Sequence, residues 1–139
     1  YRFGYAGGDD YGLSAATDNN NSILLTGYFQ GSNIDFDPGG AANYLSSQGA
    51  KDAFVLKLDA NAGYIWAIDL GSSGTFQEVG QTIKADINGN VIVGGYFSSM
   101  VDFDPSASTQ TLTSSGNYDA FIAKYSSAGV FVWAKANWT

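Results

Sequence analysis

The chain has 139 residues, the size of one domain, and its 13 acidic and 6 basic residues give a net charge of −7. This acidic balance argues against binding to nucleic acid, because phosphate backbones are bound by clustered Lys and Arg. Histidine and cysteine are both absent, which excludes Ser-His-Asp and Cys-His catalytic sites, zinc sites with thiolate or imidazole ligands, and disulfides.

Without His and Cys, few residue types remain that could bind a metal or catalyse a reaction. A metal site without His or Cys must use oxygen ligands, which favours calcium. Catalysis would have to rest on carboxylates, Lys or Tyr. No run of 18 apolar residues occurs, so the sequence predicts neither a transmembrane helix nor membrane insertion.

A repeat of about 67 residues covers nearly the whole chain. Three short motifs recur at a shift of 67 or 68 positions: Gly-Tyr-Phe at 27–29 and 95–97, [Ile/Val]-Asp-Phe-Asp-Pro at 34–38 and 101–105, and Asp-Ala-Phe at 52–54 and 119–121. Trp66 returns in the same way as Trp133, and Lys57 as Lys124. We therefore interpret residues 1–139 as one all-β unit of two repeats, about 1–70 and about 71–139.

Each repeat predicts four antiparallel strands, taken here in chain order for the second copy. The first strand covers 81–85 and ends at 86–90, where Asn-Gly favours a type I′ hairpin turn. The second strand covers 91–97, and its Gly94-Gly95 pair indicates a bulge or a close backbone approach. After 101–104 and Pro105 we expect an extra hairpin or long loop, followed by the third strand at 120–125 and the fourth at 130–135.

A four-stranded unit repeated at such an interval is typical of a propeller blade. The motif series GYF, [IV]DFDP, DAF[IV]xK and WA, followed by a Gly/Ser-rich stretch, resembles the bacterial SBBP-type β-propeller repeats over almost the whole chain. That resemblance implies a tandem-repeat protein that is secreted or attached to the bacterial cell surface. It implies a fold and a location more than an activity.

Two blades are too few to close a propeller, which has about four to eight. Three explanations stay open at this point. The chain is a fragment of a longer propeller polypeptide, or a short protomer whose copies complete one another by strand exchange into a ring or fibre. The alternative fold is a two-sheet β-sandwich.

Each Asp-Phe-Asp-Pro motif places two carboxylates around a phenylalanine, Asp35 with Asp37 in the first copy and Asp102 with Asp104 in the second. Residues two apart share one face of a strand, so the two carboxylates project together while the Phe points into the core. One interpretation is a calcium site with oxygen ligands. The other is a turn in which one Asp caps the chain before Pro.

Aromatic residues suggest a second kind of site. Tyr11, Tyr118 and Trp138 are candidates for stacking on sugar rings, with ordinary blade packing as the alternative. Trp66 and Trp133 recur at the repeat spacing. The segment 59–66 resembles the tryptophan-docking segment of quinoprotein propellers, and we interpret it as packing between blades.

The sequence therefore predicts a non-enzymatic extracellular module, structural or adhesive, that stacks or polymerises through blade packing and strand completion. Its expected partners are other copies of itself or adjacent repeats of the same polypeptide. The alternative is a lectin-like propeller module that binds polysaccharide. A glycosidase is not favoured, because Glu78 is the single Glu and a duplicated Asp pair indicates architecture.

Overall fold

The computed structural model describes residues 8–37 and 39–136. These residues contain twelve strands: β1 (Tyr11–Thr17), β2 (Ile23–Phe29), β3 (Ile34–Asp35), β4 (Tyr44–Leu45), β5 (Asp52–Leu58), β6 (Tyr64–Leu70), β7 (Val79–Ala85), β8 (Val91–Phe97), β9 (Met100–Asp102), β10 (Thr111–Thr113), β11 (Asp119–Tyr125) and β12 (Phe131–Ala136). No helix in the described part of the chain is long and apolar enough to cross a membrane.

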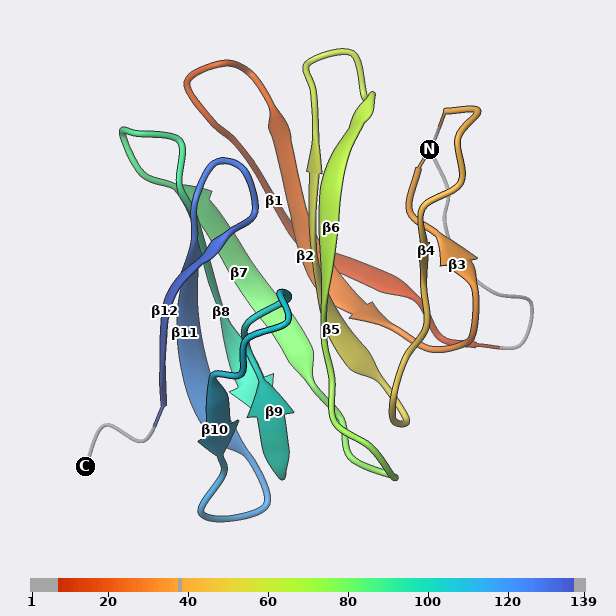
Figure 1. The fold of residues 1–139 in the computed structure, drawn as a ribbon, viewed down its shortest axis with the longest axis vertical. Coiled ribbons are helices and arrows are strands. Elements are labelled where there is room, and N and C mark those ends of the chain that lie inside the picture. Colours follow the sequence, from red (N-terminus) through yellow and green to blue (C-terminus); the bar gives the residue numbers. More distant parts are fainter. Residues whose placement is uncertain (1–7, 38, 137–139) are drawn as a thin grey trace.

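Eight of the strands form two four-stranded antiparallel sheets that lie side by side (Figure 1). The first sheet has the order β1-β2-β5-β6 and the second the order β7-β8-β11-β12. The predicted all-β class with two tandem four-stranded units is therefore confirmed, and it is consistent with propeller blades. In the second repeat, all four blade strands begin and end within two residues of their predicted bounds.

The remaining four strands form one small hairpin in each repeat, β3–β4 and β9–β10. Each hairpin lies in the chain between the second and third strands of its sheet, where the sequence predicts an extra hairpin or loop. The hairpins insert Phe36 and Phe103 into the interior, and both side chains are fully buried. Phe36 contacts Phe29 edge-on with ring centroids 5.2 Å apart, and Phe103 contacts Phe97 in the same way at 5.7 Å.

The two sheets pack through non-equivalent faces. The first sheet contributes a cross-strand row that belongs to all four of its strands: Ala16, Leu24, Lys57 and Trp66. The second sheet meets it with its opposite face, which carries the row Ala85, Val91, Tyr125 and Phe131. Consecutive blades pack in this head-to-tail way, whereas a two-sheet sandwich closed by symmetry would bring equivalent faces together.

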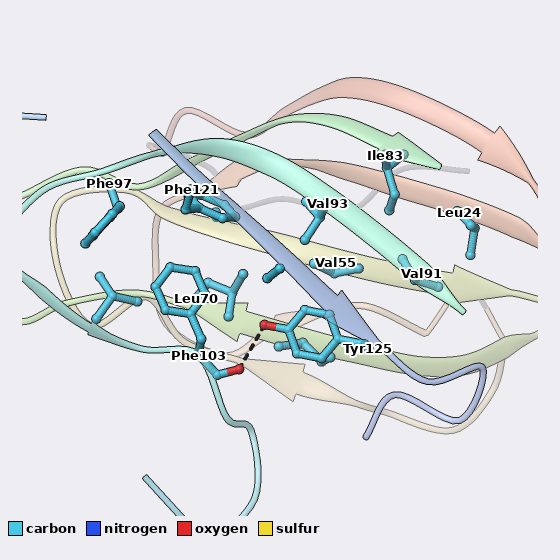
Figure 2. Close-up of a cluster of buried hydrophobic side chains, with 14 residues drawn as sticks. Leu24, Val55, Leu70, Ile83, Val91, Val93, Phe97, Phe103, Phe121 and Tyr125 are labelled. Atoms are coloured by element: carbon cyan, nitrogen blue, oxygen red, sulfur yellow. Dashed lines mark hydrogen bonds between the residues drawn. The ribbon is translucent and has the colours of Figure 1, made fainter. Parts of the chain in front are cut away.

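One apolar cluster fills the space between the sheets. Figure 2 shows its members converging from both repeats, with Leu24, Val55 and Leu70 facing Val91, Val93 and Phe121. Tyr125 is fully buried there, and its hydroxyl donates a hydrogen bond of 2.9 Å to the carbonyl of Phe103. This bond links strand β11 to the β9–β10 hairpin of the same repeat. It also satisfies a buried hydroxyl, which would be costly to leave without a partner.

All four hairpins within the sheets close with the same five-residue turn, at 18–22, 59–63, 86–90 and 126–130. In the third, Asp86 N donates to Asn90 O and Gly89 N donates to Asp86 O, both at 2.9 Å. Asn88 does not have a positive φ, whereas Gly89 has φ 76°. The predicted type I′ turn is therefore wrong. A type I turn followed by one left-handed residue forms instead. Five residues lie between the paired strand ends, whereas a type I′ turn closes a hairpin with a loop of two residues.

Glycine permits close approach at two points of the contact between the sheets. A Cβ on Gly80 would overlap the hydroxyl of Thr26. A Cβ on Gly129 would lie 2.9 Å from Cδ2 of Trp66, and Gly129 also has φ 80°. The turn at 126–130 therefore lies against the indole of the neighbouring sheet, as the interpretation of Trp66 as a packing residue between blades requires.

We expect Gly129→Ala to lower the free energy of unfolding by about 1–3 kcal/mol, because the added methyl collides with the Trp66 ring. Urea unfolding followed by circular dichroism measures the loss. Gly116→Ala is the matched control, since nothing lies within 4 Å of a Cβ there.

A double-mutant cycle separates the collision from backbone strain at Gly129. In a Trp66→Ala background the penalty of Gly129→Ala should shrink to the strain alone. Equal penalties in the two backgrounds would show that the indole does not contact this turn.

Candidate functional site

The carboxylates of the Asp-Phe-Asp-Pro motifs accept hydrogen bonds from backbone N–H groups in the loops of the small hairpins. Oδ1 of Asp35 accepts hydrogen bonds from the backbone N–H groups of Asp37 and Asn43, both at 3.0 Å. Oδ1 of Asp37 accepts one from Gly39 N at 2.7 Å. These are the local side-chain-to-backbone bonds of Asx turns, in which a carboxylate replaces a backbone acceptor.

The second repeat reproduces this arrangement. Oδ1 of Asp102 accepts hydrogen bonds from Asp104 N at 3.0 Å and Gln110 N at 2.9 Å, and Asp104 accepts one from Ser106 N at 2.9 Å. The carboxylates thus have a structural role in both copies. Within residues 8–37 and 39–136, no group of three or more acidic residues is placed to hold a metal ion. Calcium binding at Asp35, Asp37, Asp102 and Asp104 stays a prediction.

A buried acidic cluster lies where the first sheet leads into the second. Asp52 is fully buried and accepts backbone hydrogen bonds from Gln48 at 2.6 Å and Gly49 at 3.2 Å. Glu78 is 1% exposed and accepts bonds from the backbone N and the hydroxyl of Ser72, at 3.1 and 2.9 Å. Asp69, on strand β6, lies next to the Asp52 side chain of strand β5. Sequence reasoning did not find this cluster.

The surroundings of these carboxyl groups favour their protonated forms. Burial first, then the neighbouring Asp52, raise the pKa of Asp69 to about 8. Burial, with a smaller contribution from the charge of Asp52, raises the pKa of Glu78 to about 7 against the hydrogen bonds from Ser72. Burial also raises the pKa of Asp52. The side chains of Asp69 and Asp52 share a hydrogen bond, which two carboxyl groups form only when one of them carries a proton.

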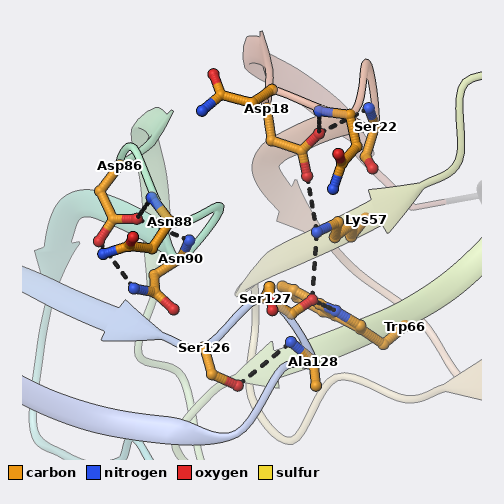
Figure 3. A network of polar contacts seen from close by, with 12 residues as sticks. Asp18, Ser22, Lys57, Trp66, Asp86, Asn88, Asn90, Ser126, Ser127 and Ala128 are labelled. Carbon is orange, nitrogen blue, oxygen red and sulfur yellow. Dashed lines mark hydrogen bonds and ion pairs between the residues drawn. The ribbon is translucent and has the colours of Figure 1, made fainter.

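A polar network joins the two sheets at the opposite, turn-bearing end (Figure 3). Lys57 Nζ lies 2.9 Å from Asp18 Oδ2 and donates a hydrogen bond of 3.2 Å to the carbonyl of Ser127 in the other repeat. Trp66 Nε1 donates to the same carbonyl at 3.1 Å. One backbone oxygen of the second sheet is therefore held by two side chains of the first.

The ion pair of this network is almost dry, with side-chain exposures of 6% for Lys57 and 1% for Asp18. Burial alone would raise the pKa of Asp18. The bond with Lys57 and the backbone N–H groups of Ser22 and Asn20 outweigh burial and lower that pKa to about 2. The carboxylate therefore stays charged at neutral pH.

The second repeat contains the same pair in an open setting. Lys124 Nζ lies 2.7 Å from Asp86 Oδ2, and the two side chains are 23% and 19% exposed. Lys124 and Asn90 lower the pKa of Asp86. The network of the first repeat thus recurs, but no described residue of another sheet accepts a hydrogen bond from Lys124.

The two sugar-stacking candidates that the structure describes belong to different repeats and contact different rings. Tyr11, 52% exposed, begins β1 and lies against Tyr28 with ring centroids 5.2 Å apart. Tyr118, 53% exposed, precedes β11 in the second repeat and contacts Tyr96 edge-on at 5.4 Å. Trp138 lies outside the described residues.

Comparison with known proteins supports the repeat fold. No protein-family model matches the chain. The chain is similar to the uncharacterized WD repeat-containing protein L264 of Acanthamoeba polyphaga mimivirus, with 28% identity over 150 residues. The alignment covers 92% of this chain but 11% of that protein's length. WD repeats are four-stranded propeller blades, so this distant similarity agrees with the two sheets of the structure.

We expect Lys57→Met to lower the free energy of unfolding by about 3–5 kcal/mol, because it leaves the buried Asp18 carboxylate without a counter-charge. Lys124→Met is the matched control at the same position of the second repeat, and its loss should be much smaller because water reaches that pair. Urea unfolding measures both losses. Equal losses would contradict a specific role for the buried pair.

The acidic cluster predicts an unusual pH dependence. The folded state keeps protons on Asp69 and Glu78 that the unfolded chain releases near pH 4, so the free energy of unfolding should fall as the pH rises from about 4 to about 8. Urea titrations at several pH values measure this slope. Asp69→Asn with Glu78→Gln should flatten it. A slope of the opposite sign would contradict protonated carboxyl groups in the folded state.

Proposed function

We propose that the chain is a non-enzymatic structural module whose blades pack against further blades, in adjacent repeats or in a second copy of the chain. One observation carries this proposal. The first sheet packs on the second with one of its faces, and the equivalent face of the second sheet is not covered by any other sheet of the described residues. In the first sheet the row contains Leu24, fully buried, and Lys57, 4% exposed.

The equivalent row of the second sheet is Lys84, Ile92, Lys124 and Trp133, joined by cross-strand pairing. Lys84 is exposed, and the other three side chains are only partly buried. On the outermost strand, Val132 is 48% exposed. Exposing the apolar side chains of this face, such as Ile92 and Trp133, to water is costly, and a neighbouring blade would remove that cost.

The chemistry of this face favours an acidic neighbour. Lys84 and Lys135 replace Ala16 and Ile68 of the first repeat, and both lysines are exposed. Together with Lys124 they place three of the chain's six basic residues on one face of the second sheet. A second copy of the chain, with its net charge of −7, supplies complementary charge.

The resemblance to SBBP-type repeats supports the rest of the proposal. Proteins with such repeats are secreted or attached to the bacterial surface, so we place the module outside the cell, in a scaffolding or adhesive role. Calcium bound by Asp35, Asp37, Asp102 or Asp104 would stiffen the hairpins and belongs to the same proposal.

The wild-type chain should associate in a concentration-dependent way, and Trp133→Asp should weaken that association at least about tenfold by placing a charge in the packing face. Sedimentation velocity measures the mass distribution. Ile87→Asp is the control, because Ile87 is 81% exposed at a turn tip outside this face.

A wild-type chain that stays monomeric at millimolar concentration would contradict association between copies. Adjacent repeats are then tested by joining two copies in tandem, which should raise the free energy of unfolding per copy. An unchanged value would overturn blade packing as the function.

A further inference from the structure

A cleft of about 480 Å³ opens in the second repeat at the end of the sheet away from the turn network. Three segments line it: the connection between β6 and β7, the residues after β8, and the turn before β11. Phe76 and Tyr118 contribute one ring from the first and third of these segments. The two residues are 43% and 53% exposed, so both present surface to a ligand.

The hydroxyls of Ser98 and Ser114 in the cleft are hydrogen-bonded to the backbone, whereas three other polar side chains are available to a ligand. Thr75, Ser99 and Asn117 line it, and their side chains form no hydrogen bond with another described residue. None of the described lining residues is charged. Binding sites for small molecules commonly combine such a volume with aromatic walls and a few well-placed polar groups.

The Tyr118 ring also borders a second, adjoining hollow of about 440 Å³. Tyr96 forms its other described wall, and the edge-on contact of these two rings at 5.4 Å holds the orientation of Tyr118. Phe76, Tyr118 and Tyr96 thus form an aromatic strip that passes from one hollow to the next. A ligand built of several linked rings matches this strip better than a single small ring.

The first repeat lacks the aromatic residues that line this cleft in the second repeat. The positions equivalent to Tyr118 and Phe76 in the first repeat are Lys51 and Gly8. Lys51 pairs with Asp9 at 3.3 Å and lies over the Tyr28 ring, 4.7 Å from its centroid. The first repeat therefore forms the same kind of blade without either aromatic ring, so the blade fold alone does not require the pair.

We propose that this cleft binds an uncharged oligosaccharide, whose sugar rings stack on Phe76 and Tyr118 while Thr75, Ser99 and Asn117 hydrogen-bond to sugar hydroxyls. Apolar C–H faces of a pyranose match the aromatic faces, and its hydroxyl groups match neutral donors and acceptors. The described lining residues include no cation, and this together with the net charge of −7 disfavours acidic glycans.

The test titrates the chain with neutral oligosaccharides, using cellohexaose, maltohexaose and chitohexaose as probes after a glycan array, at a protein concentration where sedimentation shows monomer. We expect saturable binding to at least one neutral glycan, with an affinity lowered at least about tenfold by Tyr118→Ala or Phe76→Ala. Tyr118→Phe should retain most of the affinity, because it keeps the stacking ring.

Tyr44→Ala is the matched control. Tyr44 is 60% exposed on the hairpin of the first repeat and lines neither hollow, so its loss should leave binding unchanged. Thermal unfolding of each variant establishes that it is folded. No saturable binding to any neutral glycan, or binding that survives Tyr118→Ala, overturns the proposal. Neither result bears on blade packing, which is measured by mass.

Discussion

The structure depends on one contact, in which a face of the first sheet packs against the opposite face of the second. Leu24 and Val55 are buried by it, and Lys57 and Trp66 both donate hydrogen bonds to the carbonyl of Ser127 across it. The two faces are not equivalent, so the contact cannot close on itself through a two-fold axis. The first repeat therefore meets the second with one face of the blade, and the second repeat meets the first with the other.

Much of this architecture could be predicted from the sequence, because it follows from local patterns that occur twice. Turn residues at 86–90 delimit the first two strands of the second repeat, and all four strands of that repeat form within two residues of their predicted bounds. The Asp-Phe-Asp-Pro motif predicted a buried Phe, and Phe36 and Phe103 are both fully buried. Patterns of this kind act over a few residues, where periodicity and turn chemistry decide the conformation.

The features that sequence reasoning missed depend on contacts between distant segments. Asp52, Asp69 and Glu78 lie on β5, on β6 and in the connection to β7, and no spacing rule brings them together. One signal did exist, because Asp52 recurs as Asp119 whereas Asp69 is replaced by Ala136 in the second repeat. The cleft beside Tyr118 was equally out of reach, since Phe76 approaches it through the connection between the sheets.

Comparison of the two repeats separates architecture from recognition. Residues that recur, such as the Asp18–Lys57 pair and its counterpart Asp86–Lys124, maintain the blade in both copies. The second sheet has nevertheless exchanged two apolar positions of its outer face for Lys84 and Lys135. A further identical repeat would press the apolar row of Val91 and Tyr125 against these lysines and bury their charges without partners, which is expensive. If blade packing continues from this face, a neighbour that places carboxylates beside Lys84 and Lys135 would complement it better than an identical repeat would.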